Sequence, residues 1–166
     1  PHSLLECGFE NVLVIHSLSK RSGMTGYRSG FVAGDERWIE RLRLFRANPG
    51  VVPQSFVNAA AQAAWDDDAH VEERCGIFRQ KKQIFSAFFD EMGWDYCGKE
   101  ASFYLWLKTP DGISGAELAL QLLDVGVLVS PGEMFSVAGG GSNYVRIALA
   151  PDLNSCTEAI RRWKQI

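Results

Sequence analysis

One short stretch of the sequence concentrates side chains that can do chemistry. Residues 17–30 read Ser-Leu-Ser-Lys-Arg-Ser-Gly-Met-Thr-Gly-Tyr-Arg-Ser-Gly and follow an apolar, β-type run. Lys20, placed near the end of that run, can present a partly desolvated amine, which is nucleophilic toward an aldehyde. Ser17, Ser19 and Arg28 can bind a phosphate, the hydroxyls as donors and the guanidinium as a bidentate clamp.

An aldehyde joined to a phosphate describes pyridoxal phosphate, a cofactor that these residue types can bind. Composition alone favours another interpretation, because a cluster of Ser, Lys, Arg and Gly is more often an exposed loop with solvated cations. A phosphate-binding loop without covalent lysine chemistry is a further alternative, although the Walker order Gly-x-x-x-x-Gly-Lys-Ser/Thr is absent. A serine–lysine hydrolase would use Ser17 and Lys20, but the other motifs of that arrangement are not found.

A second candidate lies near the C-terminus, where Arg146 stands between Val145 and Ile147 in a β-type run. A cation inside a strand needs an anion to satisfy it, or an edge position from which it reaches water. Both interpretations fit the pattern, so the residues alone leave open whether Arg146 binds a ligand.

Strand and helix patterns alternate along most of the chain, which predicts an α/β or α+β fold. The run at residues 11–15 suits a strand buried on both faces, as in a parallel sheet. A capping box of Ser114 and Glu117 predicts the start of one helix, and Ser155 with Glu158 predicts the cap of the last. Further strands are predicted at residues 27–34, 103–107, 127–129 and 144–150, and further helices at 38–47, 53–66 and 71–92.

Composition and charge narrow the classes of partner. Lys and Arg number 17 and Asp and Glu number 20, so the formal net charge of −3 gives no electrostatic reason to expect a nucleic acid or an acidic membrane surface. The scattered cysteines lack metal-site spacing, so we expect reduced thiols in a cytoplasmic protein without a metal. The acidic triplet at residues 66–68 is interpreted as a solvated helix end and the cap of the next helix, in preference to a metal site.

The segment around Lys20 resembles the cofactor-lysine signature of class I/II aminotransferases, which are pyridoxal-phosphate enzymes of fold type I. His16-Ser-Leu-Ser-Lys-Arg-Ser22 and Gly26-Tyr-Arg-Ser-Gly-Phe-Val-Ala-Gly-Asp35 are similar to segments of the succinyldiaminopimelate and diaminopimelate aminotransferase group. Later segments follow the family in the same order: Phe103-Tyr-Leu-Trp-Leu107, Val129-Ser-Pro-Gly132 with Phe135, and Tyr144-Val-Arg-Ile-Ala148.

The resemblance implies a role for each candidate residue. Lys20 is implied to form the Schiff base with the cofactor and to move the proton between the substrate Cα and the cofactor. Ser17 and Arg28 match phosphate-binding positions, with Ser19 as a further contact. Arg146 matches the arginine that binds the substrate α-carboxylate, and the loop at residues 131–141 is then expected to shape and cover the substrate pocket.

The resemblance maps onto only the C-terminal half of the family. It implies the end of the large domain's sheet followed by the small α/β domain, with residues 1–70 in the pyridoxal-phosphate-binding large domain and residues 71–166 as the small domain. The segments expected to carry the aromatic ring that stacks on the cofactor, and the aspartate at its ring nitrogen, are not found here. Because that aspartate makes the ring an electron sink, we expect this chain to be a fragment that is inactive, or nearly so, on its own.

For the intact protein the resemblance implies a homodimeric, cytoplasmic aminotransferase that moves an amino group between an amino acid and a 2-oxo acid. Succinyldiaminopimelate or diaminopimelate, with glutamate, is the implied substrate pair, in lysine biosynthesis. Two alternatives stay open: a lyase or synthase on the same fold, and an aminotransferase-like domain of a transcription regulator that senses pyridoxal phosphate.

Overall fold

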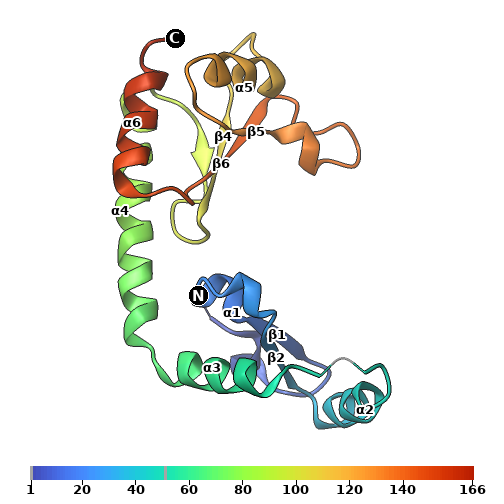
Figure 1. The fold of residues 1–166 in the computed structure, drawn as a ribbon. Coiled ribbons are helices and arrows are strands. Elements are labelled where there is room, and N and C mark those ends of the chain that lie inside the picture. Colours follow the sequence, from blue (N-terminus) through green and yellow to red (C-terminus); the bar gives the residue numbers. More distant parts are fainter. Residues whose placement is uncertain (1, 51) are drawn as a thin grey trace. The chain divides into compact units, whose positions relative to one another are not determined.

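The computed structural model describes residues 2–50 and 52–166. The chain divides into two compact units between residues 74 and 75 (Figure 1). Helix α4 (Ala69–Glu91) begins in the first unit and continues in the second. Among the residues described, no helix is long and apolar enough to cross a membrane. The assignment of residues 1–70 and 71–166 to parts of a large and a small domain stays a prediction.

The first unit contains a pair of antiparallel strands, β1 (Leu13–Ser17) and β2 (Gly30–Gly34). The expectation of a parallel strand buried on both faces is wrong for the described residues. The ladder partner of β1 is antiparallel, and Ile15 in the middle of β1 is 82% exposed because no described element covers that side chain. The pattern of apolar residues therefore predicted a strand correctly but not its neighbours.

Short helical turns separate the two strands. Helix α1 (Leu18–Arg21) follows β1 directly, and a 3-10 turn, η2 (Thr25–Tyr27), comes before β2. Arg28 is in the left-handed region with φ of 51°, so the chain cannot be extended there and β2 begins later than residue 27, where its start was predicted. The remaining helices of this unit are η1 (Leu4–Cys7), α2 (Glu36–Arg46) and α3 (Ser55–Asp66).

Asp35 links the start of α2 to the segment before β1. Its carboxylate accepts hydrogen bonds from the backbone N–H of Asn11 at 2.8 Å and of Arg37 at 3.0 Å. It also pairs with the Arg37 guanidinium at 2.9 Å, although Asp35 itself is only 5% exposed. The Arg37 guanidinium, followed by the Asn11 N–H, holds the pKa of the Asp35 carboxyl well below its usual range.

We expect Asp35→Asn to lower the thermal unfolding midpoint at about pH 7, because the amide loses the charge that both partners recognise. Because the pKa of Asp35 is lowered in the folded state, its carboxylate stabilises the fold at pH values above the ordinary pKa of 3.8. This contribution is lost as the pH falls from 3.8 toward the folded-state pKa. The difference between wild type and variant should therefore shrink between about pH 5 and about pH 3. Thermal scans across this range test it, with the exposed Asp111→Asn as control; a difference independent of pH contradicts it.

The second unit packs helices against one face of a four-stranded antiparallel sheet (Figure 1). Along β4 and β6, Leu105, Leu107, Val145 and Ile147 are buried together with aromatic residues of α4 and α6, including Phe88, Phe89 and Trp163. Strand alternation turns the intervening residues of β4 and β6 to the opposite face. The strands, in sheet order, are β3 (Tyr96–Cys97), β4 (Tyr104–Lys108), β6 (Tyr144–Ala148) and β5 (Ser130–Pro131), and the other elements are α5 (Gly115–Asp124), η3 (Gly132–Phe135) and α6 (Leu153–Trp163).

Two predicted features of the second unit are wrong in detail. The strand predicted at residues 127–129 is not one: Val127 and Val129 are buried, but the ladder to β6 begins only at Ser130. Helix α6 is capped by Asp152, whose side chain accepts from the Ser155 N–H, whereas Ser155 itself was expected to be the cap. In both cases the element was predicted close to the right residues, but the residues that form its hydrogen bonds were not.

Helix α4 buries two lysines in the second unit. Lys81 donates to the Leu149 carbonyl at 3.2 Å, and Lys82 donates to the Ala101 carbonyl at 2.7 Å. Burial lowers the pKa of the Lys82 ammonium group. Because backbone carbonyls satisfy the charged ends, the aliphatic stems can lie on the packed face of the helix.

The capping box predicted for α5 is confirmed. The Ser114 hydroxyl accepts from the Glu117 N–H at 3.2 Å, and the Glu117 carboxylate accepts from the Ser114 N–H at 2.8 Å. Both bonds satisfy N–H groups that the first turn of a helix otherwise leaves without partners. Hydrogen bonding to the backbone and hydroxyl of Ser114 also lowers the pKa of Glu117.

We expect Ser114→Ala to reduce the free energy of unfolding by about 1 kcal/mol, the usual effect of removing an N-cap hydroxyl. Urea unfolding of the two proteins measures the difference. Ser142→Ala is the matched control, because Ser142 is exposed and accepts from the Gly115 N–H through its backbone carbonyl, which alanine keeps. Equal losses in the two variants would assign the effect to something other than the cap.

Candidate functional site

Ser17 ends β1 and begins the short helix that carries Lys20. Its hydroxyl accepts from the Ser19 N–H at 3.1 Å and donates to the Ser29 carbonyl at 3.3 Å. The next residue, Leu18, is fully buried, and its N–H donates to the same Ser29 carbonyl at 3.1 Å. These contacts fix the turn after β1 and place Lys20 close to the strand end, as the sequence predicted.

Lys20 itself is exposed in the described residues. The expectation of a partly desolvated amine is therefore not met here. The helix α1 has a single turn, and Leu18 is its buried residue.

Arg28 lies at the same end of the strand pair as Ser17. Ser17 pairs with Gly30, two residues beyond Arg28, in the ladder of β1 and β2. Arg28 is exposed, and among the described residues its guanidinium donates from Nη1 to the Thr25 carbonyl at 3.3 Å. Its other N–H groups are of the kind that binds an anion such as a phosphate.

Arg21, the other arginine of this segment, has a structural role. It donates from Nη1 to the Ala64 carbonyl and from Nη2 to the Asp68 carboxylate. Its guanidinium carbon also lies 4.8 Å from the centre of the Trp65 ring, and its side chain is only 11% exposed. These contacts occupy Arg21 with helix α3 and the turn after it, which leaves Arg28 as the candidate anion-binding arginine.

The acidic triplet at residues 66–68 follows the favoured interpretation. Asp66 ends α3, and the Asp67 carboxylate accepts from the Ala69 N–H at 2.9 Å at the start of α4. Asp68 pairs with Arg21. Hydrogen bonds from His70 lower the pKa of Asp67, as expected for a carboxylate at a helix start.

Arg146 belongs to the second unit and lies in the middle of its sheet. It pairs with Trp106 of β4 on one side and with Ser130 of β5 on the other. The interpretation of Arg146 as an edge-strand arginine that points to water is therefore wrong. On the face opposite the helices, its guanidinium carbon lies 4.4 Å from the ring centre of Tyr104 and 4.1 Å from that of Phe135.

The Nε atom of Arg146 is buried and has no hydrogen-bond partner among the described residues. A buried donor without a partner costs stability, so such an atom indicates a missing acceptor. Trp106 adds a further ring to the aromatic residues around Arg146. Its ring centre lies 5.7 Å from that of Phe135 and 5.8 Å from that of Tyr144. Sequence reasoning found Arg146 but not these aromatic neighbours, although the alternation of Tyr104 and Trp106 in β4 pointed to a shared face.

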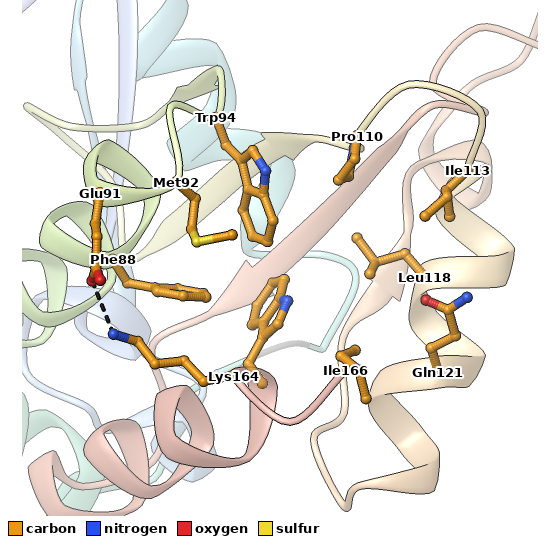
Figure 2. A pocket seen from close by; sticks show the side chains of 11 residues that line it. Phe88, Glu91, Met92, Trp94, Pro110, Ile113, Leu118, Gln121, Lys164 and Ile166 are labelled. Carbon is orange, nitrogen blue, oxygen red and sulfur yellow. Dashed lines mark hydrogen bonds and ion pairs between the residues drawn. The ribbon is translucent and has the colours of Figure 1, made fainter.

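A separate cavity of about 340 Å³ lies among the helices of the second unit (Figure 2). Phe88, Trp94 and Trp163 form much of its aromatic wall, and Lys164 pairs with Glu91 at 2.9 Å at one side. None of the residues predicted to bind cofactor or substrate lines this cavity. The candidate residues lie instead at the strand end around Lys20 in the first unit and, separately, around Arg146 in the second unit.

Residues 2–162 match the aminotransferase class I and II family, and the chain belongs to that family. It is 36% identical over 153 residues to the 4-dedimethylamino-4-oxo-anhydrotetracycline transaminase of Streptomyces rimosus, covering 89% of this chain and 42% of that protein. It is 33% identical over 157 residues to an LL-diaminopimelate aminotransferase of Dehalococcoides mccartyi, covering 92% of this chain and 40% of that protein.

Solved structures agree with the family assignment. An aminotransferase from Neisseria meningitidis superposes with a TM-score of 0.89 at 33% identity, covering 98% of this chain and 42% of the other. A probable N-succinyldiaminopimelate aminotransferase from Thermus thermophilus gives 0.81 at 28% identity, covering 95% and 43%. The predicted resemblance and the predicted α/β fold, as part of a fold type I enzyme, are confirmed. The chain spans about two fifths of the length of these relatives.

Proposed function

We propose that the protein containing this chain is a pyridoxal-phosphate-dependent aminotransferase that transfers an amino group between an amino acid and a 2-oxo acid. The observation that carries the proposal is the placement of an exposed lysine, Lys20, beside Ser17 and Arg28 at one end of a strand pair, in a chain of the aminotransferase class I and II family. A cytoplasmic homodimer is part of the proposal for the whole protein.

Arg28 would hold the cofactor phosphate through its remaining N–H groups, with Ser17 and Ser19 as hydroxyl donors. A serine hydroxyl has one hydrogen, so Ser17 must release the Ser29 carbonyl before it can donate to a phosphate. That hydrogen bond is long, at 3.3 Å, which favours such an exchange. The Ser17 lone pair that accepts from Ser19 N–H is not needed for the exchange, so the start of α1 stays capped.

Lys20 would bind the cofactor covalently and then act as the acid–base group. When bound, pyridoxal phosphate supplies an electron sink that makes the substrate Cα–H acidic. Once the substrate amine has displaced Lys20 from the cofactor, the freed Lys20 amine would take that proton from Cα as general base and deliver it to the cofactor as general acid. The exposed position of Lys20 among the described residues supports this role.

Arg146 would bind the substrate α-carboxylate. A guanidinium matches a carboxylate with two parallel N–H···O hydrogen bonds, which fixes orientation as well as charge. For the substrate itself we propose diaminopimelate or its N-succinyl derivative, with glutamate as the partner amino acid, in lysine biosynthesis. Support comes from the LL-diaminopimelate aminotransferase and the probable N-succinyldiaminopimelate aminotransferase among the similar proteins. The similar 4-dedimethylamino-4-oxo-anhydrotetracycline transaminase is named for a very different substrate.

The visible absorption spectrum of the full-length gene product with pyridoxal phosphate tests this proposal, with the present chain as control. We expect a cofactor band that is converted by glutamate and restored by 2-oxoglutarate, and neither change with the chain alone. A band that responds to no amino acid would favour a lyase, a synthase or a cofactor-sensing domain. Absence of any band in the full-length protein would contradict the assignment of Lys20.

A further inference from the structure

We propose that Phe135 and Tyr104 are positioning residues that hold the Arg146 guanidinium in the orientation needed to receive a carboxylate edge-on. The inference rests on the proposed function for the identity of the carboxylate, that of an α-amino acid. Its physical basis is the packing around Arg146 in the second unit alone. It assigns Phe135, which lies in the loop at residues 131–141, a role in substrate affinity.

The rings of Tyr104 and Phe135 contact the Arg146 guanidinium through cation–π interactions, which use none of its N–H donors. Their centres lie 4.4 Å and 4.1 Å from the guanidinium carbon, well inside the distance at which a cation is attracted to a ring face. A guanidinium is planar and carries all its N–H donors in that plane. Rings packed against it restrict its rotation without using any donor, so the edge of Arg146 stays available.

The buried Nε atom identifies which edge is prepared. It has no hydrogen-bond partner among the described residues, although it is shielded from solvent. A carboxylate that accepts from Nε–H and from one neighbouring Nη–H would satisfy this donor in the two-bond geometry that arginine favours. An apolar or a singly hydrogen-bonding group could not do so. The geometry therefore points to a carboxylate as the ligand of this edge.

The two rings reach Arg146 from different elements. Tyr104 is in β4, whose ladder with β6 fixes its backbone, whereas Phe135 is the last residue of the 3-10 turn η3. Trp106 supports Phe135 from the side, with ring centres 5.7 Å apart. Phe135 is still 47% exposed, so its ring can be replaced with little loss of packing. A Phe135 variant thus separates orientation of Arg146 from the stability of the fold.

The test compares Phe135→Leu with Phe135→Tyr in the full-length protein, with Leu120→Met as control. Leu120 lies in α5, outside the loop at residues 131–141, and is 62% exposed, so its replacement should change neither affinity nor activity. Propionate, which carries a carboxylate and no amine, is the binding probe, followed by intrinsic tryptophan fluorescence. We expect Phe135→Leu to raise the propionate Kd and the glutamate KM by about tenfold, with kcat within about twofold of wild type. Phe135→Tyr should keep both values, because the ring face is retained.

Failure of this inference and failure of the proposed function give different results. If the protein transaminates no amino acid but Phe135→Leu weakens propionate binding, the positioning role stands and the proposed function falls. The inference is overturned if propionate does not bind the wild type, if Phe135→Leu leaves the Kd unchanged, or if Phe135→Tyr loses as much affinity as Phe135→Leu. Should Phe135→Leu fail to fold by circular dichroism, the pair Tyr104→Leu and Tyr104→Phe decides by the same criteria.

Discussion

Replacing Lys20 with alanine is expected to lower kcat for transamination by the full-length protein by about ten-thousand-fold. A positioned acid–base group contributes about 10²–10⁴ to a rate, and the same amine is also proposed as the covalent attachment point of the cofactor. Solvent cannot replace either role, because water lacks a fixed position next to the substrate Cα. Stopped-flow measurement of the half-reaction with glutamate gives the rate in both proteins.

Two controls make this result specific to Lys20. Lys164→Ala removes another amine, one that pairs with Glu91 in the second unit, and should keep the wild-type rate. Borohydride reduction with pyridoxal phosphate, followed by peptide mass spectrometry, should place the cofactor on the peptide that contains Lys20. A label on a different lysine, or a Lys20→Ala protein with a tenth of the wild-type kcat, would refute the covalent assignment.

The sequence predicted the helices and the central strands well because their information is local. The capping box at Ser114 is an example, since both of its hydrogen bonds join residues three positions apart. Strand ends were less predictable. The sequence pattern ended the first strand at residue 15, but His16 and Ser17 continue the ladder opposite Phe31 and Gly30, because backbone pairing does not require apolar side chains.

Long-range contacts explain most of what the sequence could not show about the site. The neighbouring sequence does not distinguish the roles of Arg21 and Arg28. They differ because Arg21 donates hydrogen bonds to Ala64 and Asp68, which lie more than 40 positions further along the chain. Likewise, the choice between an edge and a central strand for Arg146 depends on which strands flank β6. The residue types were sufficient to nominate the candidates, whereas their roles depended on partners contributed by other elements.

The exposed apolar residues of the first unit show the same dependence. Leu13, Ile15 and Phe31 are all more than two fifths exposed, although they lie in strands whose composition is that of buried ones. Burial of a strand is decided by the elements packed on its faces, and those described here cover only part of this pair. The apolar composition of these strands therefore predicts a burial that the described elements of this chain do not provide.

Replacing Arg146 with leucine is expected to lower kcat/KM for α-amino acids by about 10²–10³-fold, with most of the loss in KM. Removing one partner of a buried, hydrogen-bonded charge pair usually costs about 2–5 kcal/mol, which corresponds to about 30- to 4,000-fold and includes this range. Arg146→Lys should recover only part of the loss, since an ammonium group keeps the charge but not the planar pair of donors. Arg161→Leu is the matched control, because that arginine pairs with Glu158 on the surface of α6.

The effect of Arg146→Leu on stability should run opposite to its effect on activity. Arg146 keeps a buried Nε donor without a described partner, so leucine removes an unsatisfied polar group from the packed aromatic surroundings. We therefore expect the thermal unfolding midpoint of the ligand-free full-length protein to stay equal or rise. A residue that merely supports the sheet would lose stability and activity together. A variant that loses activity while keeping its unfolding midpoint would mark Arg146 as a position maintained for its ligand, at the expense of the fold.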